Sequence, residues 1–317
     1  MFMLLFLDCT KAFDRISHYG LFIKLMEQKV PLVLLLLIIH WHLNLSCKVR
    51  WGNAYSDEFP VPLGTKQGGV MSPRLFATYV NDMIQLLRNN GVGCHILKLF
   101  LACILFADDL ALIAPSRSGL QKMIDICNQY CNRYCLTFNA KKSKAMVFGN
   151  VKNSDTIAPL VLNGSILELV PEWKYLGTTI CAGKAFSFTA RPDVSSFYRA
   201  ANSVLNVLTD AREDVLMNLL YSNCIPILTY ACPIKQYSSS DMTSCNTAIN
   251  SVIRKIFGFA RRESVRVLRK ISGYKSIYVL FTESREKFMT AAETHHNPIV
   301  RFMASLNVNL EVEEIVD

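Results

Sequence analysis

The sequence contains eleven cysteines but no Cys-x-x-Cys pair, so it lacks the usual ligand spacing of a zinc site. Residues 1–7 carry no basic side chain, which argues against a secretory signal, and the apolar run 31–39 is too short to span a bilayer. We find no internal repeat, coiled coil or low-complexity tract. We therefore expect an intracellular protein, nuclear or cytoplasmic, with free thiols, no membrane association and a buried helix at 31–39.

Positive charge is abundant and unevenly distributed. The net charge is +9, and residues 251–290 hold ten Lys or Arg against three Glu. Such a cluster favours a polyanionic partner, and a basic helical face would contact phosphates without reading sequence. A solvated basic surface is the alternative for this segment. Hydrophobic residues make up 51% of the chain, which is a high share. Such a share is expected where part of the surface packs against further domains.

Two adjacent aspartates, Asp108 and Asp109, separate the apolar runs 102–107 and 110–114. This pattern predicts a buried hairpin with both carboxylates at its turn. Neighbouring carboxylates repel and lose solvation, so they favour a bound cation, although a solvated acidic turn has the same pattern. Asp8 ends a second apolar run and is equally costly to bury alone.

Hydrophobic patterning predicts strands at 2–8 and 144–149, hairpins at 101–114 and 160–182, and helices at 18–29, 32–44, 73–90, 117–133 and from 192 onward. A glycine-rich turn at 64–69 leads into the helix at 73–90, for which Ser72 is the expected N-cap and Pro73 the first helical residue. Cys127, Cys131 and Cys135 recur every four residues, so we expect them to pack on one buried helical face.

Five motifs in this order resemble the palm motifs of reverse transcriptases, in the version found in non-LTR (LINE-type) retrotransposons. They are Asp8-x-x-Lys-Ala-Phe-Asp14, Gln67-Gly-Gly-x-x-Ser-Pro-x-Leu-Phe76, Phe106-Ala-Asp-Asp109, Leu136-Thr-Phe-Asn-x-x-Lys-Ser-Lys144 and Trp173-Lys-Tyr-Leu-Gly177. The last resembles the primer-grip hairpin of the family, and residues 197–257 resemble the thumb segment that follows it.

The resemblance implies an α+β fold: a right-hand polymerase palm, with an antiparallel sheet and packed helices, followed by a helical thumb. The implied domains are a partial palm at 1–159, a primer-grip-like β-hairpin at 160–185 and a basic thumb and connection region at 186–317. Only seven residues precede Asp8. We therefore expect an N-terminally truncated chain with the fingers largely absent and little or no activity alone.

The resemblance also implies the catalytic acids. Asp8, Asp108 and Asp109 would bind two Mg²⁺ ions, with Mn²⁺ as a possible substitute. Lys142 would complete the catalytic set as proton donor to the leaving pyrophosphate, with Lys141 and Lys144 as neighbouring alternatives.

Three further residues would contact the incoming nucleotide. Phe13 would lie under its sugar and exclude a 2′-hydroxyl. Gln67 and Gly68 would contact the nucleotide or the template near the glycine turn.

The implied function is that of an RNA-directed DNA polymerase, a two-metal nucleotidyltransferase whose partners are an RNA template, a DNA primer and deoxynucleoside triphosphates. A non-catalytic nucleic-acid-binding remnant of such an element is the alternative. An intron-maturase or telomerase-like relative would share the palm motifs. The sequence makes no prediction about oligomeric state.

Overall fold

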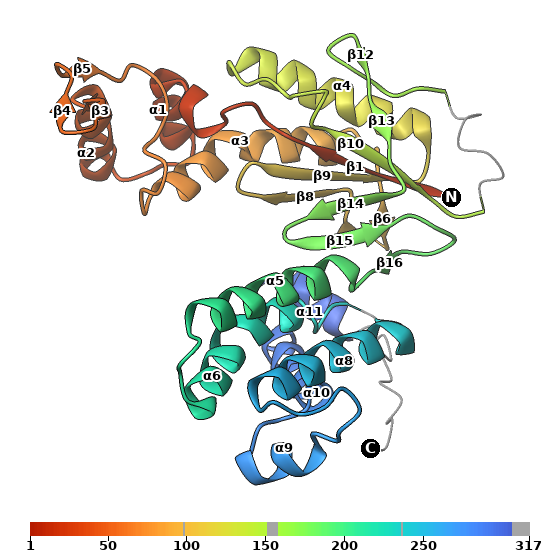
Figure 1. Ribbon diagram of the computed structural model, residues 1–317. Helices are drawn as coiled ribbons and strands as arrows, with labels where there is room; N and C mark the ends of the chain where they lie inside the picture. The colour runs from red at the N-terminus through yellow and green to blue at the C-terminus, as the bar shows by residue number, and fades with distance from the viewer. Residues whose placement is uncertain (98, 151–157, 236, 306–317) are drawn as a thin grey trace. The chain divides into compact units, whose positions relative to one another are not determined.

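The computed structural model describes residues 1–97, 99–150, 158–235 and 237–305, except for the side chains of 270–272. The chain divides into two compact units, which are labelled by element in Figure 1. The first contains residues 1–171 and 182–185, and the second contains 172–181 and the chain from 186 onward. Each unit has its own hydrophobic core.

A five-stranded sheet in the order β13-β10-β1-β9-β8 forms the centre of the first unit. The central strand β1 (Phe2–Leu7) pairs antiparallel with β9 (Asp109–Ala114) and with β10 (Lys144–Phe148). The edge strand β8 (Cys103–Phe106) is antiparallel to β9, whereas β13 (Glu168–Leu169) runs parallel to β10. The strands expected at 2–8 and 144–149 are therefore confirmed, as is the hairpin of the adjacent aspartates.

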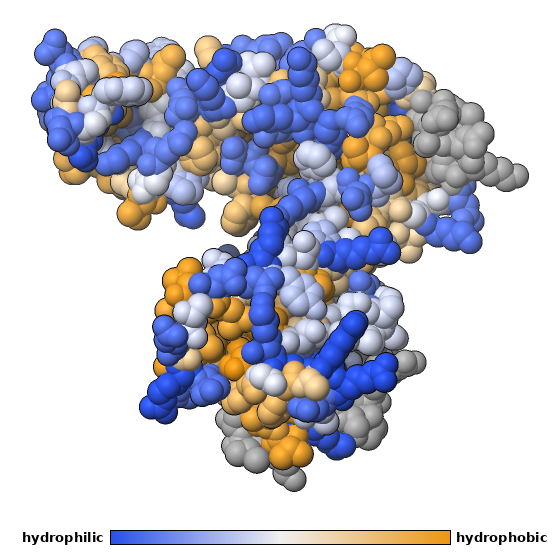
Figure 2. All heavy atoms as spheres, in the orientation of Figure 1, coloured by the Kyte–Doolittle hydropathy of each residue, from blue (hydrophilic) through white to orange (hydrophobic). Residues whose placement is uncertain are grey.

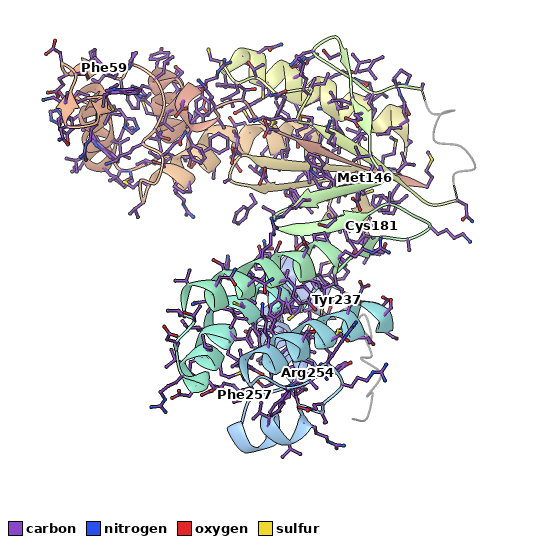
Figure 3. The ribbon with its side chains drawn as sticks, in the orientation of Figure 1. Phe59, Met146, Cys181, Tyr237, Arg254 and Phe257 are labelled. Atoms are coloured by element: carbon purple, nitrogen blue, oxygen red, sulfur yellow. The ribbon has the colours of Figure 1, made fainter. Side chains whose placement is uncertain are left out.

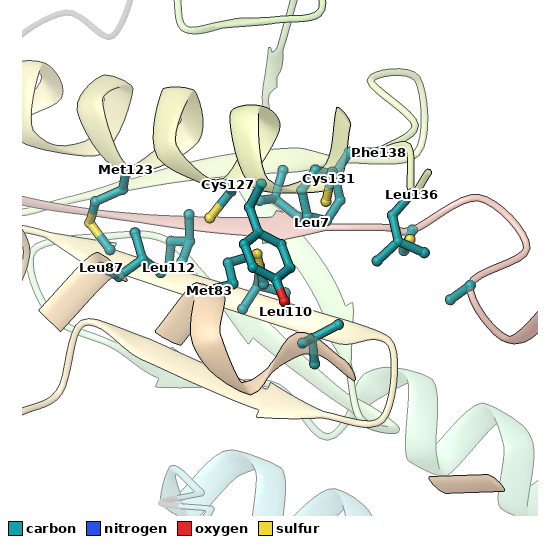
Figure 4. Close-up of a cluster of buried hydrophobic side chains, with 14 of the residues drawn as sticks. Leu7, Met83, Leu87, Leu110, Leu112, Met123, Cys127, Cys131, Leu136 and Phe138 are labelled. Atoms are coloured by element: carbon teal, nitrogen blue, oxygen red, sulfur yellow. The ribbon is translucent and has the colours of Figure 1, made fainter. Parts of the chain in front are cut away.

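Alternate residues of the sheet pack against two amphipathic helices, α3 (Ser72–Asn89) and α4 (Arg117–Arg133). Figure 4 shows α4 above the sheet, with Cys127 and Cys131 directed into the same cluster as Leu7 and Leu110. Because side chains in a strand alternate between the two faces, every second residue of β1 reaches this core.

The rest of the first unit consists of shorter elements. They are the 3₁₀ helix η1 (Phe13–Arg15), helices α1 (His18–Glu27) and α2 (Leu32–Leu43), and the hairpin strands β2 (Ser46–Cys47), β3 (Arg50–Trp51), β4 (Ala54–Tyr55), β5 (Phe59–Pro60), β6 (His95–Ile96), β7 (Leu99–Phe100), β11 (Val161–Leu162) and β12 (Ser165–Ile166). Pairing joins β2 to β5, β3 to β4, β6 to β7 and β11 to β12.

The second unit combines a small antiparallel sheet with a helical bundle. The sheet contains β14 (Glu172–Tyr175), β15 (Thr178–Cys181) and β16 (Ser187–Phe188). The helices are α5 (Arg191–Val207), α6 (Glu213–Leu219), the π-helical turn η3 (Leu220–Cys224), α7 (Ile225–Thr229), α8 (Ser239–Ile256), α9 (Arg266–Ser272), α10 (Ile277–Glu293) and α11 (Pro298–Ser305). The expected α+β composition is thus confirmed.

The structure corrects the burial predicted for the apolar run 31–39. It forms helix α2, but most of the leucines there are exposed, and only Leu35, Ile38 and His42 of this helix are buried. A helix that is apolar on every side can bury only the stripe that meets a neighbouring element. Among the described residues, no helix has both the length and the hydrophobicity needed to cross a membrane.

Two local expectations are also wrong. Ser72 is not the N-cap of α3: Met71 occupies that position, and the Ser72 hydroxyl instead donates to the carbonyl oxygen of Lys66 at 2.5 Å. Cys135 does not share the buried face of Cys127 and Cys131, because α4 ends at Arg133 and Cys135 is exposed with a φ of 58°. Periodicity predicted both ends of this helix correctly, but the four-residue spacing of the cysteines continues past its end.

Candidate active site

The strand register brings the three predicted acids to one edge of the sheet. Leu7 at the end of β1 pairs with Leu110 in β9. In an antiparallel pair, the residue after Leu7 lies opposite the residue before Leu110, so Asp8 faces Asp109. Asp108 precedes Asp109 at the turn of the β8–β9 hairpin. Residues a hundred positions apart in the sequence therefore form one acidic edge.

The hairpin turn that presents Asp108 has an unusual backbone. Phe106 pairs directly with Asp109, so the turn has only two residues, and the first of them, Ala107, has a φ of 52°. Two-residue hairpin turns need a positive φ at this position, which favours glycine or asparagine over alanine. Backbone strain of this kind is common at functional sites and is held by the surrounding strands.

One side chain, that of Ser143, and one backbone amide, that of Asn139, fix the backbone of Asp8, and neither residue is among the predicted catalytic residues. The buried Ser143 hydroxyl accepts a hydrogen bond from the Asp8 amide at 3.2 Å and donates to the Asn139 carbonyl at 2.8 Å. The Asn139 amide in turn donates to the Asp8 carbonyl at 2.8 Å. The sequence carried a signal for both, because Asn139 and Ser143 are part of the motif that includes Lys142.

Lys142 is the basic residue that the structure places at the acidic edge. Its Nζ lies 3.9 Å from Asp8 Oδ2, and the Asn139 side chain accepts from the Lys142 amide at 3.3 Å. Lys144 points elsewhere and forms an ion pair with Glu168. No ion pair of Lys141 occurs among the described residues, so of the three neighbouring lysines only Lys142 contacts a predicted catalytic acid.

The charges of Asp8 and Asp108 act electrostatically on Asp109 and on Cys9. Partial burial raises the pKa of the Asp109 carboxyl, and the charges of Asp108 and Asp8 raise it further. Burial likewise raises the pKa of the neighbouring Cys9 thiol to about 11, with Asp108 and Asp8 adding to the effect, so this cysteine is neutral at physiological pH. Clustered carboxylates repel one another, which makes ionisation of Asp109 less favourable. A cation bound beside them would offset this repulsion.

These donors suit Mg²⁺ better than a metal that needs a complete protein cage. Among the described residues, no three His, Cys, Asp or Glu side chains converge tightly enough to hold an ion by themselves. Mg²⁺ is commonly held by one or two carboxylates, with waters and substrate phosphates completing its octahedron. The carboxylate oxygens of Asp8, Asp108 and Asp109 fit that role.

The predicted nucleotide-contacting residues lie on two segments that pack together, with Phe13 in η1 and with Gln67 and Gly68 in the glycine-rich turn. The Phe13 ring is half-buried and packs against Phe76 of α3, with ring centroids 5.1 Å apart. The Phe13 carbonyl accepts from the Thr65 amide at 2.8 Å, and Gly64 lies so close that a Cβ there would be 2.9 Å from the backbone of Asp14. The glycine turn is therefore held against the segment that follows Asp8.

Gln67 and Gly68 form the exposed tip of this turn. The Gln67 side chain donates to Asp14 Oδ1 at 2.9 Å, which links the second motif to the first. Gly68 has a φ of 76° and open space where a Cβ would be. A backbone without a side chain at such a position allows close approach by a phosphate or a base.

Comparison with known proteins agrees with this geometry. Residues 2–180 match the family model described as reverse transcriptase (RNA-dependent DNA polymerase). The chain is 27% identical to the RNA-directed DNA polymerase from mobile element jockey of Drosophila funebris, over 84% of this chain and 28% of the relative. It is 30% identical to the probable RNA-directed DNA polymerase from transposon BS of Drosophila melanogaster, over 55% of this chain and 19% of that protein. The chain thus spans less than a third of the length of these relatives.

Solved structures give a more distant likeness. Telomerase from Candida albicans, solved with a fragment of telomeric RNA, matches with a TM-score of 0.45 and 12% identity, over 100% of this chain and 52% of that chain. With the family match covering more than half of its residues, the chain belongs to the reverse transcriptase family, as the reverse transcriptase domain of a LINE-type element.

Proposed function

We propose that the acidic edge formed by Asp8, Asp108 and Asp109 is the catalytic centre of RNA-templated DNA synthesis. The observation that carries this proposal is the register of β1 and β9, which places Asp8 opposite the Asp108–Asp109 turn. In the reaction, a primer 3′-hydroxyl attacks the α-phosphate of a deoxynucleotide, and pyrophosphate leaves. The first unit would be the palm of this polymerase and the helical unit its thumb.

The carboxylates of this edge would hold two Mg²⁺ ions, or Mn²⁺ in their place. When bound, the metal lowers the pKa of the attacking hydroxyl and neutralises charge on the phosphates. The protein supplies position: Ser143 and Asn139 hold the backbone of Asp8, and the two-residue turn holds Asp108 beside Asp109. Lys142 would move from Asp8 to the leaving pyrophosphate and donate a proton to it.

Phe13 in η1 and Gly68 in the glycine-rich turn would together bind the incoming nucleotide. The Phe13 ring, supported by Phe76, offers a flat apolar surface for the sugar. Contact there leaves no room for a 2′-hydroxyl, the group that distinguishes a ribonucleotide from a deoxyribonucleotide. Gln67 would lie beside the nucleotide or template while it remains bonded to Asp14.

Metal binding is the decisive test, because it can be measured on this chain alone, although the chain spans only part of the length of its relatives. Mn²⁺ binding to the purified chain is followed by electron paramagnetic resonance. We expect Asp108→Asn to weaken it by about tenfold or more, since even supporting residues of metal sites are worth that much. Asp14→Asn is the matched control, because Asp14 lies in the same motif and is assigned no metal. Equal losses in the two variants would refute the assignment.

Primer extension on poly(rA)/oligo(dT) separates this function from the non-catalytic alternative. Mg²⁺-dependent extension that falls by about 10²–10³-fold in Asp108→Asn would support the polymerase. Binding of the duplex with neither Mn²⁺ binding nor extension would favour a nucleic-acid-binding remnant.

A further inference from the structure

A basic pocket in the helical unit lies outside the elements that carry the acidic edge. It has a volume of about 460 Å³ and is formed by three consecutive segments: the last turns of α8, the start of α9 with the loop before it, and the loop before α10. Asn246, Asn250 and Arg254 line it from α8, at intervals of four residues, and therefore from one face of that helix. Figure 3 marks Arg254 on α8 near α9.

The charge of the pocket has one sign. Arg254, Arg266 and Arg269 line it, and no Asp or Glu is among its described lining residues. Neither Arg254 nor Arg266 forms an ion pair within the described part of the chain. Three guanidinium groups with no carboxylate in the lining repel one another, so an anion in the pocket would be stabilising.

The structure also orders the groups that would meet such an anion. Arg254 donates its Nε–H to the Glu263 carbonyl at 2.7 Å, which orients its guanidinium, and both terminal nitrogens of Arg269 donate to Asn246 Oδ1 at 3.3 and 3.4 Å. Tyr274 adds an aromatic wall and is itself held, since its ring stacks on Tyr221 at 4.4 Å. Preorganised guanidinium donors are the usual recognition chemistry for phosphate.

We propose that this pocket binds a phosphate ester. Its volume is within the range of ligand sites and accommodates a phosphate with an attached sugar. Two sources share this chemistry, a nucleic-acid backbone and a free nucleotide or inorganic phosphate. Binding of a nucleic-acid backbone here rests on the thumb role proposed above, whereas binding of a free phosphate ester does not. Neither depends on the catalytic acids.

The test compares two charge-matched double variants of the full chain. Arg254→Gln with Arg266→Gln alters the pocket, whereas Arg261→Gln with Arg262→Gln removes the same charge from exposed positions outside its lining. Fluorescence anisotropy with a labelled RNA–DNA duplex should show about a tenfold loss of affinity and a salt slope reduced by about one to two for the pocket pair. The control pair should change the affinity by much less.

A second arm uses inorganic phosphate and deoxythymidine monophosphate, with binding followed by calorimetry. Pocket-dependent binding of these anions with unchanged duplex affinity would assign the pocket to free phosphate esters. Equal effects of the two double variants on the duplex, with no pocket-dependent anion binding, would overturn the proposal. Arg266→Gln alone guards against misfolding, because this exposed side chain has no hydrogen bond or ion pair among the described residues. Since no arm measures catalysis, failure here is distinguishable from failure of the polymerase proposal.

Discussion

At the scale of single residues, the acidic edge is an unfavourable arrangement of charge that a bound cation would relieve. The raised pKa of Asp109 reflects burial first and the nearby charges of Asp108 and Asp8 second. The only basic side chain paired with these acids in the described structure is Lys142, at 3.9 Å from Asp8. A lysine that is 68% exposed gains little from such a pair, so exchanging Asp8 for another anion would cost it little.

We expect Lys142→Ala to slow primer extension by about 10²–10⁴-fold if the lysine acts as general acid. The pH dependence of extension should then lose its limb on the alkaline side, because that limb reports deprotonation of the acid. Lys141→Ala is the control, since Lys141 has no ion pair in the described structure and should keep near-native rates. A similar loss in both variants would instead point to a general effect of positive charge.

At the scale of helices and strands, the packing of α1 against α2 buries two histidines. His18 in α1 and His42 in α2 are both buried, with ring centroids 5.0 Å apart. Burial lowers the pKa of His42, the hydrogen bond to the Ile38 carbonyl opposes this, and His18 lowers it further. Protonation of His42 is therefore less favourable in the folded state than in the unfolded chain.

The consequence for stability has a definite sign. Above the ordinary histidine pKa of 6.5, His42 is neutral in both states and the packing of α1 on α2 is fully stable. As the pH falls through 6.5, the unfolded state takes up the proton first, so the free energy of unfolding decreases. Thermal unfolding at neutral and mildly acidic pH should show this loss, and His42→Leu should reduce it. An unchanged pH dependence in that variant would exclude His42 as the cause.

The β14–β15 hairpin depends on a close contact with the segment after α7. Its turn residues Leu176 and Gly177 both have positive φ, 45° and 78°. The Tyr230 hydroxyl donates to the Leu176 carbonyl at 2.9 Å, and a Cβ on Gly177 would be 2.9 Å from the Tyr230 ring. The backbone and the ring thus both require glycine at this position.

We expect Gly177→Ala to lower the free energy of unfolding by about 1–2 kcal/mol through the left-handed conformation alone, with a further loss from contact with Tyr230. Urea denaturation of Gly177→Ala, Tyr230→Ala and the double variant measures the coupling. Gly177→Ala should lower the free energy of unfolding by less in the Tyr230→Ala background, where the ring is absent. If the losses of the two single variants simply add in the double variant, the contact with Tyr230 contributes nothing beyond the backbone strain.

At the scale of the whole molecule, charged and apolar surface are not fully segregated, since the helical unit also exposes apolar side chains such as Phe259 and Val267. The helical unit carries the basic segment 251–290, and Figure 2 shows hydrophilic side chains projecting from it. In the first unit, exposed apolar side chains concentrate on α2 and the hairpins after it, including Leu37, Leu43 and Trp51. An apolar surface of that kind is typical of an interface, whereas the basic one suits a polyanion.

The full chain should therefore bind RNA–DNA duplex without sequence preference and with steep salt dependence. Even three phosphate contacts predict a loss of more than about tenfold in affinity between 50 and 200 mM salt, through counterion release. Anisotropy measurements on duplexes of unrelated sequence provide the test. Asp108→Asn should leave this binding unchanged in the absence of divalent metal. Affinity that is insensitive to salt would contradict a phosphate-based interface.

The sequence alone predicted β1, β10, the hairpin of the adjacent aspartates and the main helices, because hydrophobic periodicity is a local property. Motif order pointed to the acids that we propose as catalytic. It could not determine the exposure of Cys135, the cap of α3 or the exposure of α2, since these depend on which neighbouring elements are present.

Only the tertiary structure brought Asp8 opposite Asp109, because that contact depends on the register between strands far apart in the sequence. Tertiary structure also distinguished Lys142 from its neighbours and revealed Ser143 as the support for Asp8. The basic pocket has the same origin. Its arginines are visible in the sequence as a cluster of charge, but their convergence requires α8, α9 and the loop before α10 to fold together.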